Sequence, residues 1–285
     1  YDDWELWVRM YKQGHMPAFC NKILLTTRNR PTGITIASKD SMRIWMARLH
    51  KLHVRKLADI VIPHHNRHDL LENCLKGIDP KRFNVIMIGG GTFAENCNKG
   101  ARLAETDDII FLNDDVETNS EALAYLAKSK YDIKGITQLI DGEKVYGMGW
   151  QYQKNVSIGE SFFLSRDMDS VSVPSGYCFK IKRKVWEALG GFDERFQNGA
   201  EDCDLFFKAI EKGYKFGVVD YPMVHLHSQS EGRYDMQKEN WKLFAKLWDD
   251  KRFKGIIKKV KKAKKANIHQ FESREREGGL AWERA

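Results

Sequence analysis

Long apolar runs are missing from this sequence, and so are clustered cysteines and proline-rich stretches. A membrane-spanning helix needs about 20 consecutive apolar residues, and the lack of such a run argues against a transmembrane segment. With 42% hydrophobic residues, 30% charged residues and six prolines, the composition is that of a globular protein. No secretory leader is visible, although the chain begins at Tyr1 and a leader could precede it.

The cysteines are odd in number, widely spaced and without a C-x-x-C pair: Cys20, Cys74, Cys97, Cys178 and Cys203. This pattern argues against a disulfide framework and against a structural zinc site. Free cysteines fit a reducing compartment, so we expect a cytoplasmic protein.

Positive charge is concentrated near the C-terminus. The formal net charge is +8, and one short stretch contains Lys258, Lys259, Lys261, Lys262, Lys264 and Lys265. Such a run can hold anionic lipid or nucleic acid, which predicts a peripheral membrane or nucleic-acid contact through Lys258–Lys265. A solvated helix face or a frayed tail explains the same run equally well.

Short β-branched runs alternate with helical patterns in the first part of the chain. Strands are expected at 58–63, 85–88 and 108–112, with helices at 68–78 and 93–104 between them. This order argues for the α/β class, with a mainly parallel central sheet flanked by helices. Later helices are expected at 121–127, 183–189, 202–212 and 238–248, and later strands at 171–173, 177–181 and 216–219.

Residues 1–25 align with residues 200–224 at a constant offset of 199, so that Asp3 falls on Asp202 and Gly14 falls on Gly213. Both copies contain acids, an amphipathic helix, a glycine and a strand. The repeat predicts that residues 1–53 are the C-terminal remnant of a preceding related domain, or a helical extension. A chance alignment of two amphipathic helices is the alternative.

Asn113, Asp114 and Asp115 directly follow the strand expected at 108–112. Open α/β sheets bind ligands outside the carboxyl ends of their strands. Adjacent carboxylates repel each other unless a cation or water lies between them, and Mg²⁺ or Mn²⁺ prefers oxygen ligands. We therefore expect a divalent-metal site here, with a helix N-cap or Asx turn before Ser120 as the alternative.

Three acids open the helix expected at 202–212: Glu201, Asp202 and Asp204. Capping and the helix dipole explain one or two acids at such a position. Three exceed what a cap needs, so a carboxylate at this helix start could serve as a general base.

Two further features carry weaker signals. His225 and His227 lie on one face of an extended segment, and they become metal-ligand candidates only if the fold brings them near Asp115. The glycines at 89–91 lack both a P-loop lysine and dinucleotide-binding spacing, so we interpret them as a turn.

Six segments, in order and at suitable spacing, resemble the family 2 glycosyltransferases, which have the Rossmann-like GT-A fold. These segments are IVIPHHNR (60–67), ENCNKGARLA (95–104), FLNDDVE (111–117), SGYCFKIKRKVWEALGGFDERF (175–196), AEDCDLFFKAIEKGY (200–214) and VHLHSQS (224–230). They are similar to the family's P-x-x-N-R turn, N-x-G helix, D-x-D-type motif, acceptor-side segment, E-D helix and terminal histidine motif. The resemblance implies a catalytic domain over 58–249 and a basic tail over 250–285, and it makes residues 1–53 the end of a second such domain.

The resemblance implies an inverting transferase that moves a sugar from a nucleotide-diphosphate sugar, most often UDP-linked, to a hydroxyl of a saccharide or lipid-linked acceptor. Asp115 with His227 or His225 would bind Mn²⁺ or Mg²⁺, which offsets charge on the leaving diphosphate. Asp202 would be the general base, and Glu201 would bind the acceptor or support Asp202. The remaining implied contacts are Pro63, Asn66, Arg67, Asn98, Asn113 and Asp114 to the donor, and Ser175, Gly176 and Asp204 to the acceptor.

The chain departs from the family at the nucleotide. Family members usually follow the second strand with an Asp-rich D-x-G-S-x-D turn, whereas this chain reads MIGGGTFAENCNKG. Recognition of the base must therefore differ. Two alternatives remain: a transferase that glycosylates modified bases in DNA, which the basic balance motivates, and a non-catalytic GT-A-fold binding module, which the shortened loop motivates.

Overall fold

The computed structural model describes residues 56–154, 156–226, 235–265 and 270–272. The predictions made for residues 1–53, for His227 and for the chain beyond residue 272 lie outside these ranges. No helix within them is long and apolar enough to cross a membrane.

A curled sheet forms the centre of the described part, with strand order β11-β10-β5-β9-β3-β1-β2. The strands are β1 (Ala58–Pro63), β2 (Phe83–Ile88), β3 (Asp108–Leu112), β5 (Ile133–Ile140), β9 (Cys178–Lys182), β10 (Phe216–His225) and β11 (Gln270–Glu272). On this path only β9 runs against its neighbours, β3 and β5. The carboxyl ends of β1, β2, β3, β5 and β10 therefore meet at one edge of the sheet.

Short strands complete the framework. β4 (Val116–Glu117) pairs with the end of β10, and β6 (Glu143–Val145) pairs with β5. β7 (Gly147–Trp150) and β8 (Phe162–Ser165) form a separate two-stranded sheet.

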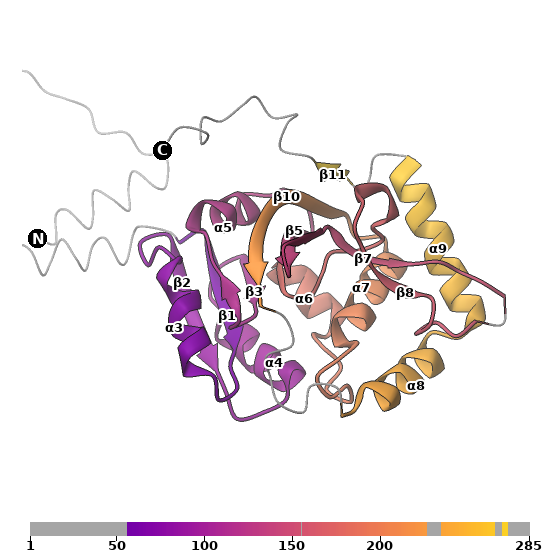
Figure 1. Cartoon of the computed structure of the whole chain (residues 1–285), viewed down its shortest axis with the longest axis horizontal. Coiled ribbons are helices and arrows are strands. Elements are labelled where there is room, and N and C mark those ends of the chain that lie inside the picture. The colour runs from indigo at the N-terminus through magenta and orange to yellow at the C-terminus, as the bar shows by residue number, and fades with distance from the viewer. Residues whose placement is uncertain (1–55, 155, 227–234, 266–269, 273–285) are drawn as a thin grey trace, which may run out of the picture. The chain divides into compact units, whose positions relative to one another are not determined.

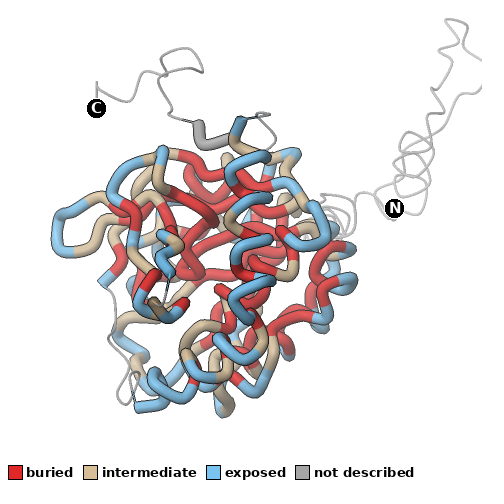
Figure 2. Tube along the Cα trace, turned by 90° about the vertical axis from the view of Figure 1, so that its right-hand side faces the viewer, coloured by how far each residue is buried: buried red, intermediate tan, exposed pale blue. Residues whose placement is uncertain are grey.

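Helices cover both faces of the central sheet, and the buried layer between them is visible in Figure 2. One face packs against α3 (His68–Lys76) and α5 (Ser120–Ala127). The other face packs against α4 (Phe93–Leu103), α6 (Arg183–Leu189) and α7 (Glu201–Lys212), with α8 (Gln237–Leu247) and α9 (Asp250–Lys265) joining the same cluster (Figure 1).

Alternation along the strands explains why both faces are apolar. Ile60 and Ile62 of β1 belong to the cluster under α3 and α5, whereas Val61 belongs to the cluster under α4. Successive strand residues point to opposite faces, so a strand buried on both sides is expected to be mostly apolar. The expected α/β fold, with a mainly parallel sheet flanked by helices, is confirmed.

Two expected strands differ from the structure. Residues 171–173 form no strand, and Val173 makes only an isolated bridge to Met148. The strand expected at 216–219 instead continues to His225, with a register shift between Val219 and Met223. Pro222 lies inside this shift, where its missing N–H costs no regular ladder bond.

Candidate active site

A cleft of about 710 Å³ lies at the edge where the carboxyl ends of the parallel strands meet. Most of the acids and one histidine singled out in the sequence line it, although they come from distant segments. The lining includes Pro63, Asn113, Asp114, Asp115, Ser175, Gly176, Glu201, Asp202 and His225. The structure thus brings together residues from β1, β3, β10, α7 and the loop before β9.

Strand β4 brings His225 to Asp115. The chain turns back after Asp115 and pairs Val116 with His225 at the end of β10, and Leu226 N–H donates to Asp115 O at 3.0 Å. His225 Nε2 lies 3.1 Å from Asp115 Oδ1, and both side chains are buried. The condition set for His225 as a metal-ligand candidate, proximity to Asp115, is met.

A buried hydrogen-bond chain continues behind His225. His225 Nδ1 donates to Gln138 Oε1 at 2.7 Å, and Gln138 Nε2 donates to Ser175 Oγ at 3.0 Å. The ring also stacks on Tyr177, with centroids 5.0 Å apart. An amide oxygen can only accept, so the neutral ring carries its proton on Nδ1. The Nε2 lone pair then lies 3.4 Å from Asn113 Nδ2 and beside Asp115 Oδ1.

The residues around this pair fit a hard divalent cation. Asn113 Oδ1 is buried and has no hydrogen-bond partner in the part of the chain that the structure describes. Carboxylate and amide oxygens are ligands that Mg²⁺ and Mn²⁺ prefer, whereas an imidazole nitrogen is a softer ligand that favours Mn²⁺ over Mg²⁺. No three His, Cys, Asp or Glu side chains gather around a common point among the described residues, so phosphate or water oxygens would have to complete the shell.

Asp114 lies next to this group and has its own partner. His64, which follows β1, places its Nδ1 2.7 Å from Asp114 Oδ2. Burial raises the pKa of Asp114 above its ordinary value, the His64 hydrogen bond opposes this, and the neighbouring Asp115 charge adds to the rise. The site therefore confines negative charge in a poorly hydrated place, which favours cationic ligands.

The start of α7 forms another wall of the cleft. Ala200 caps the helix with φ 69°, a left-handed conformation that costs a non-glycine residue about 1–2 kcal/mol. Gly199 N–H donates to Glu201 Oε2 at 2.6 Å, and Cys203 N–H donates to Asp202 Oδ1 at 2.8 Å. The other oxygen of Asp202 lies so close to Gly176 that a Cβ there would overlap it. Gly176 thus leaves room for the Asp202 carboxylate.

Residues 121–254 match the model of the family described as "Glycosyl transferase family group 2". The match confirms the expected resemblance to the family 2 glycosyltransferases over this part of the chain. It supports glycosyl transfer as the general function, which implies a nucleotide-sugar donor and an acceptor as partners. The matched range contains Gly176, Glu201, Asp202 and His225, whereas Asp115 precedes it. No curated protein matches the sequence.

Three residues predicted to contact the donor lie outside the cleft lining: Asn66, Arg67 and Asn98. Asn66 is exposed and has φ 56°, which fits the turn after β1. Arg67 caps α3 and forms a two-pronged ion pair with Asp69 at 3.0 and 2.8 Å. From this turn, His64 and His65 line the cleft instead. The donor-binding roles of Asn66 and Arg67 stay predictions.

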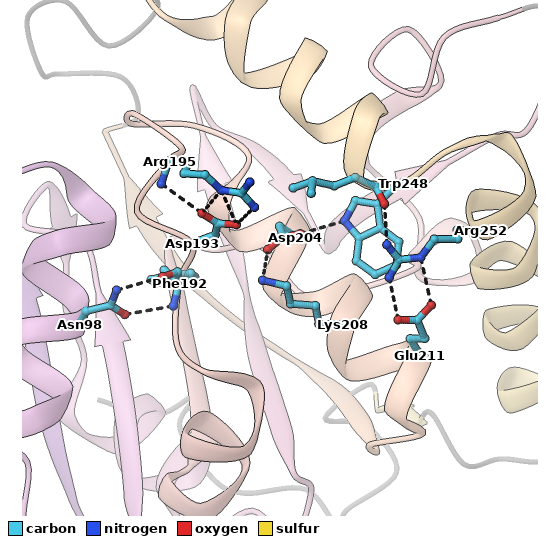
Figure 3. A network of polar contacts seen from close by, with 10 residues as sticks. Asn98, Phe192, Asp193, Arg195, Asp204, Lys208, Glu211, Trp248 and Arg252 are labelled. Carbon is cyan, nitrogen blue, oxygen red and sulfur yellow. Dashed lines mark hydrogen bonds and ion pairs between the residues drawn. The ribbon is translucent and has the colours of Figure 1, made fainter.

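Asn98 and Asp204 form hydrogen bonds that hold segments of the fold together (Figure 3). Asn98 Nδ2 donates to Phe192 O at 2.9 Å, and Phe192 N–H donates to Asn98 Oδ1 at 3.0 Å, so α4 holds the turn after α6. Asp204 accepts from Trp248 Nε1 at 2.9 Å and pairs with Lys208 at 2.6 Å. Neither residue is part of the cleft lining, and their predicted roles toward donor and acceptor stay predictions.

The turn after β2 is as short in the structure as in the sequence. Gly90 has φ 85°, and Thr92 caps α4 in a capping box with Glu95. Glu95 Oε2 accepts from Thr92 N–H at 2.9 Å, so the acid closest to this turn is used by the helix cap. Backbone and small side chains at 90–92 line the cleft here, where the family usually has acids.

Sequence reasoning missed several cleft residues, among them His64, His65 and Gln138. His64 and His65 stand between two residues that the motif did single out, and the pair of histidines beside an expected acid site was the available signal. Gln138 lies in β5, which was not expected as a strand, so nothing in the sequence pointed to it.

Proposed function

We propose that this chain is an inverting glycosyltransferase of hexosyltransferase type that uses a nucleotide-diphosphate sugar, with UDP as the first choice of nucleotide. The acceptor is a hydroxyl of a saccharide or of a lipid-linked saccharide. One observation carries the proposal: a single cleft holds the Asp115–His225 pair at the sheet edge and the Asp202 carboxylate on Gly176. Such an arrangement offers a place for a diphosphate and a base within one cavity.

The donor side is assigned to the strand ends. Asp115, His225 and the buried Asn113 oxygen would hold Mn²⁺ or Mg²⁺, which when bound offsets the charge developing on the diphosphate. Asp114, oriented by His64, accepts hydrogen bonds from ribose or sugar hydroxyls. The backbone of the 89–91 turn takes the place of the family's acids near the nucleotide base.

The acceptor side is assigned to α7. Asp202 takes the proton from the acceptor hydroxyl as its oxygen bonds to the anomeric carbon and the bond to the diphosphate breaks on the opposite face. The Cys203 N–H bond to Asp202 Oδ1 holds this carboxylate in place at the start of α7. General-base catalysis of this kind contributes about 10²–10⁴-fold in rate. Glu201, buried and bound to Gly199 N–H, holds the loop that leads into α7 and Asp202.

A cytoplasmic location belongs to the same proposal. The cysteines in the described ranges, Cys74, Cys97, Cys178 and Cys203, are free and buried. Burial raises the pKa of the Cys74 thiol to about 12, which keeps it unreactive. Free thiols of this kind fit a reducing compartment.

A pair of matched variants tests the proposal. UDP-, GDP-, CDP- and dTDP-sugars are incubated with the protein and Mn²⁺, and hydrolysis with water in place of the acceptor is followed by mass spectrometry. Asp202→Asn is expected to lower the rate by about 10²–10⁴-fold. Asp204→Asn, the same change two residues further along α7, is expected to retain it because Asp204 lies outside the cleft lining.

Each outcome has a distinct meaning. Equal rates for the parent and Asp202→Asn would remove Asp202 as the base. Equal losses in both variants would point to a folding defect rather than catalysis, which thermal unfolding would reveal. Binding of a nucleotide diphosphate without any turnover would leave a binding module with this fold.

A further inference from the structure

The net positive charge of the chain comes entirely from helix α9. It contains nine Lys or Arg residues and one Asp, a net charge of +8. The whole sequence also has a net charge of +8, so the other residues balance with 38 basic and 38 acidic side chains. The excess charge is therefore a property of one helix.

The two faces of α9 are opposite in character. Phe253, Ile256 and Val260 are buried in the same core cluster as α7. The face turned away from the core carries only exposed lysines: Lys251, Lys254, Lys258, Lys261, Lys262 and Lys265. Spacings of three, four and seven residues place these side chains in one stripe along the helix. At 1.5 Å per residue the stripe is about 21 Å long.

Only one lysine of the stripe has an acidic partner in the ranges that the structure describes. Lys254 pairs with Asp250 at 2.7 Å. The other five, Lys251, Lys258, Lys261, Lys262 and Lys265, form no ion pair or hydrogen bond with any residue in the ranges that the structure describes. Other lysines of α9 form hydrogen bonds with neighbouring elements, but they lie off the stripe. Lys259, for example, donates to Glu211 O of α7. Adjacent like charges on a helix destabilise it unless a counter-charge is nearby.

We propose that this lysine stripe docks the protein on an anionic lipid surface. A flat headgroup layer can contact every ammonium group of a straight helix face at once. The stripe has no arginine, aromatic or amide side chain. In nucleic-acid interfaces arginine binds phosphates in a two-pronged way, aromatic rings stack on bases, and amides read base edges. Their absence from the stripe favours a lipid surface over nucleic acid. The apolar residues of α9 are already used in the core, so docking is electrostatic and needs no insertion.

The strength of such docking follows from the number of lysines. Each basic residue near an anionic leaflet contributes about fivefold in affinity, and the attraction decays within a Debye length of about 8–10 Å. Removing four lysines is therefore expected to weaken binding at least tenfold, and moderate salt is expected to release the parent protein.

The test is a vesicle sedimentation assay on the full chain. Vesicles of phosphatidylcholine alone are compared with vesicles that also contain phosphatidylglycerol. The stripe variant carries Lys258→Gln, Lys261→Gln, Lys262→Gln and Lys265→Gln. A control variant with the same net charge carries Lys81→Gln, Lys99→Gln, Lys128→Gln and Lys184→Gln, which are exposed positions scattered over other elements.

The proposal expects the parent and the control variant to sediment with anionic vesicles and the stripe variant to stay in solution, with equal thermal unfolding for all three. Three results would overturn it: no binding by the parent, equal loss in both variants, or tighter binding of the parent to duplex DNA than to anionic vesicles at the same salt. The last result would assign the stripe to nucleic acid instead. None of these outcomes depends on the transferase activity.

Discussion

Replacing Gln138 by leucine is expected to weaken metal binding without touching any metal ligand. In the parent protein Gln138 Oε1 accepts from His225 Nδ1 at 2.7 Å and so directs Nε2 to Asp115. Leucine has a similar volume and cannot accept a hydrogen bond. The His225 ring then loses the partner that fixes its tautomer and its orientation.

The magnitude follows from burial. Gln138 is 1% exposed and His225 is 4% exposed, so water cannot easily replace the lost bonds. Loss of an outer partner of a metal-binding histidine typically costs about 10–100-fold in metal affinity. Leaving buried polar groups of His225 and Ser175 unpaired costs about 1–3 kcal/mol each in the free energy of unfolding.

The assay is a titration of free Mn²⁺ by electron paramagnetic resonance, with and without UDP, alongside urea unfolding. Gln138→Glu is the conservative variant, since its carboxylate still accepts from His225 Nδ1, and it is expected to retain Mn²⁺ binding. Thr137→Val is the matched control. It removes the buried side-chain hydrogen bond from Thr137 Oγ1 to Asp220 at 3.2 Å on the adjacent residue of β5.

Equal Mn²⁺ affinity in the parent and in Gln138→Leu would refute the reasoning. The same conclusion would follow if Thr137→Val lost as much affinity as Gln138→Leu, because the effect would then reflect general destabilisation of β5.

Three further variants test other parts of the site. Asp114→Asn is expected to raise the melting temperature at neutral pH, because the raised pKa of Asp114 means that its charged form destabilises the folded state. This gain is expected to vanish as the pH falls below the ordinary carboxyl pKa of 3.8, and a gain that persists there would contradict this origin. Gly176→Ala is expected to displace the Asp202 carboxylate and to lower the rate of donor hydrolysis by about 10²-fold, while UDP binding measured by calorimetry stays unchanged. Unchanged turnover would show that catalysis does not need the close approach of Asp202 to Gly176. Ala200→Gly removes the Cβ from a residue with φ 69° and is expected to add about 1 kcal/mol to the free energy of unfolding in urea. A loss of stability would contradict the inference that the Ala200 backbone is strained.

The first part of the fold could be predicted because its strands carry apolar residues on both faces. β1 contains the run IVI (60–62) and β3 the run IIFL (109–112), and residues that break the pattern follow each run. The acids of the site could be found for the same reason, since Asp115 follows a strand and Asp202 opens a helix.

The middle of the fold could not be predicted because tertiary contacts override the local pattern. β5 reads IKGITQLI and lies in the centre of the sheet, although it contains a lysine, a glycine and a glutamine. Lys134 is buried with its ammonium group 4.7 Å from the Tyr125 ring centre, and Gly135 makes room for Pro174. Only the packed structure supplies the partners that make these polar or small residues acceptable in a strand.

A motif also cannot tell which residues of a helix face the cleft. Asp202 and Asp204 lie two residues apart at the start of α7, yet the first lines the cleft and the second bonds to Trp248. Helical geometry turns the second acid about 200° away from the first. Its ion-pair partner Lys208 lies one helical turn later, but the Trp248 N–H that donates to it lies 44 positions later in the sequence, where local reasoning cannot find it.

The most direct test of the proposed function is a calorimetric titration of UDP, GDP, CDP and dTDP, with and without Mn²⁺, on the parent chain and on Asp115→Ala. We expect one nucleotide to bind the parent only when Mn²⁺ is present, and we expect that binding to disappear in Asp115→Ala. Binding that is indifferent to Mn²⁺ and to Asp115, or no binding of any of the four nucleotides, would contradict the proposal that the Asp115–His225 pair holds the donor diphosphate through a metal ion.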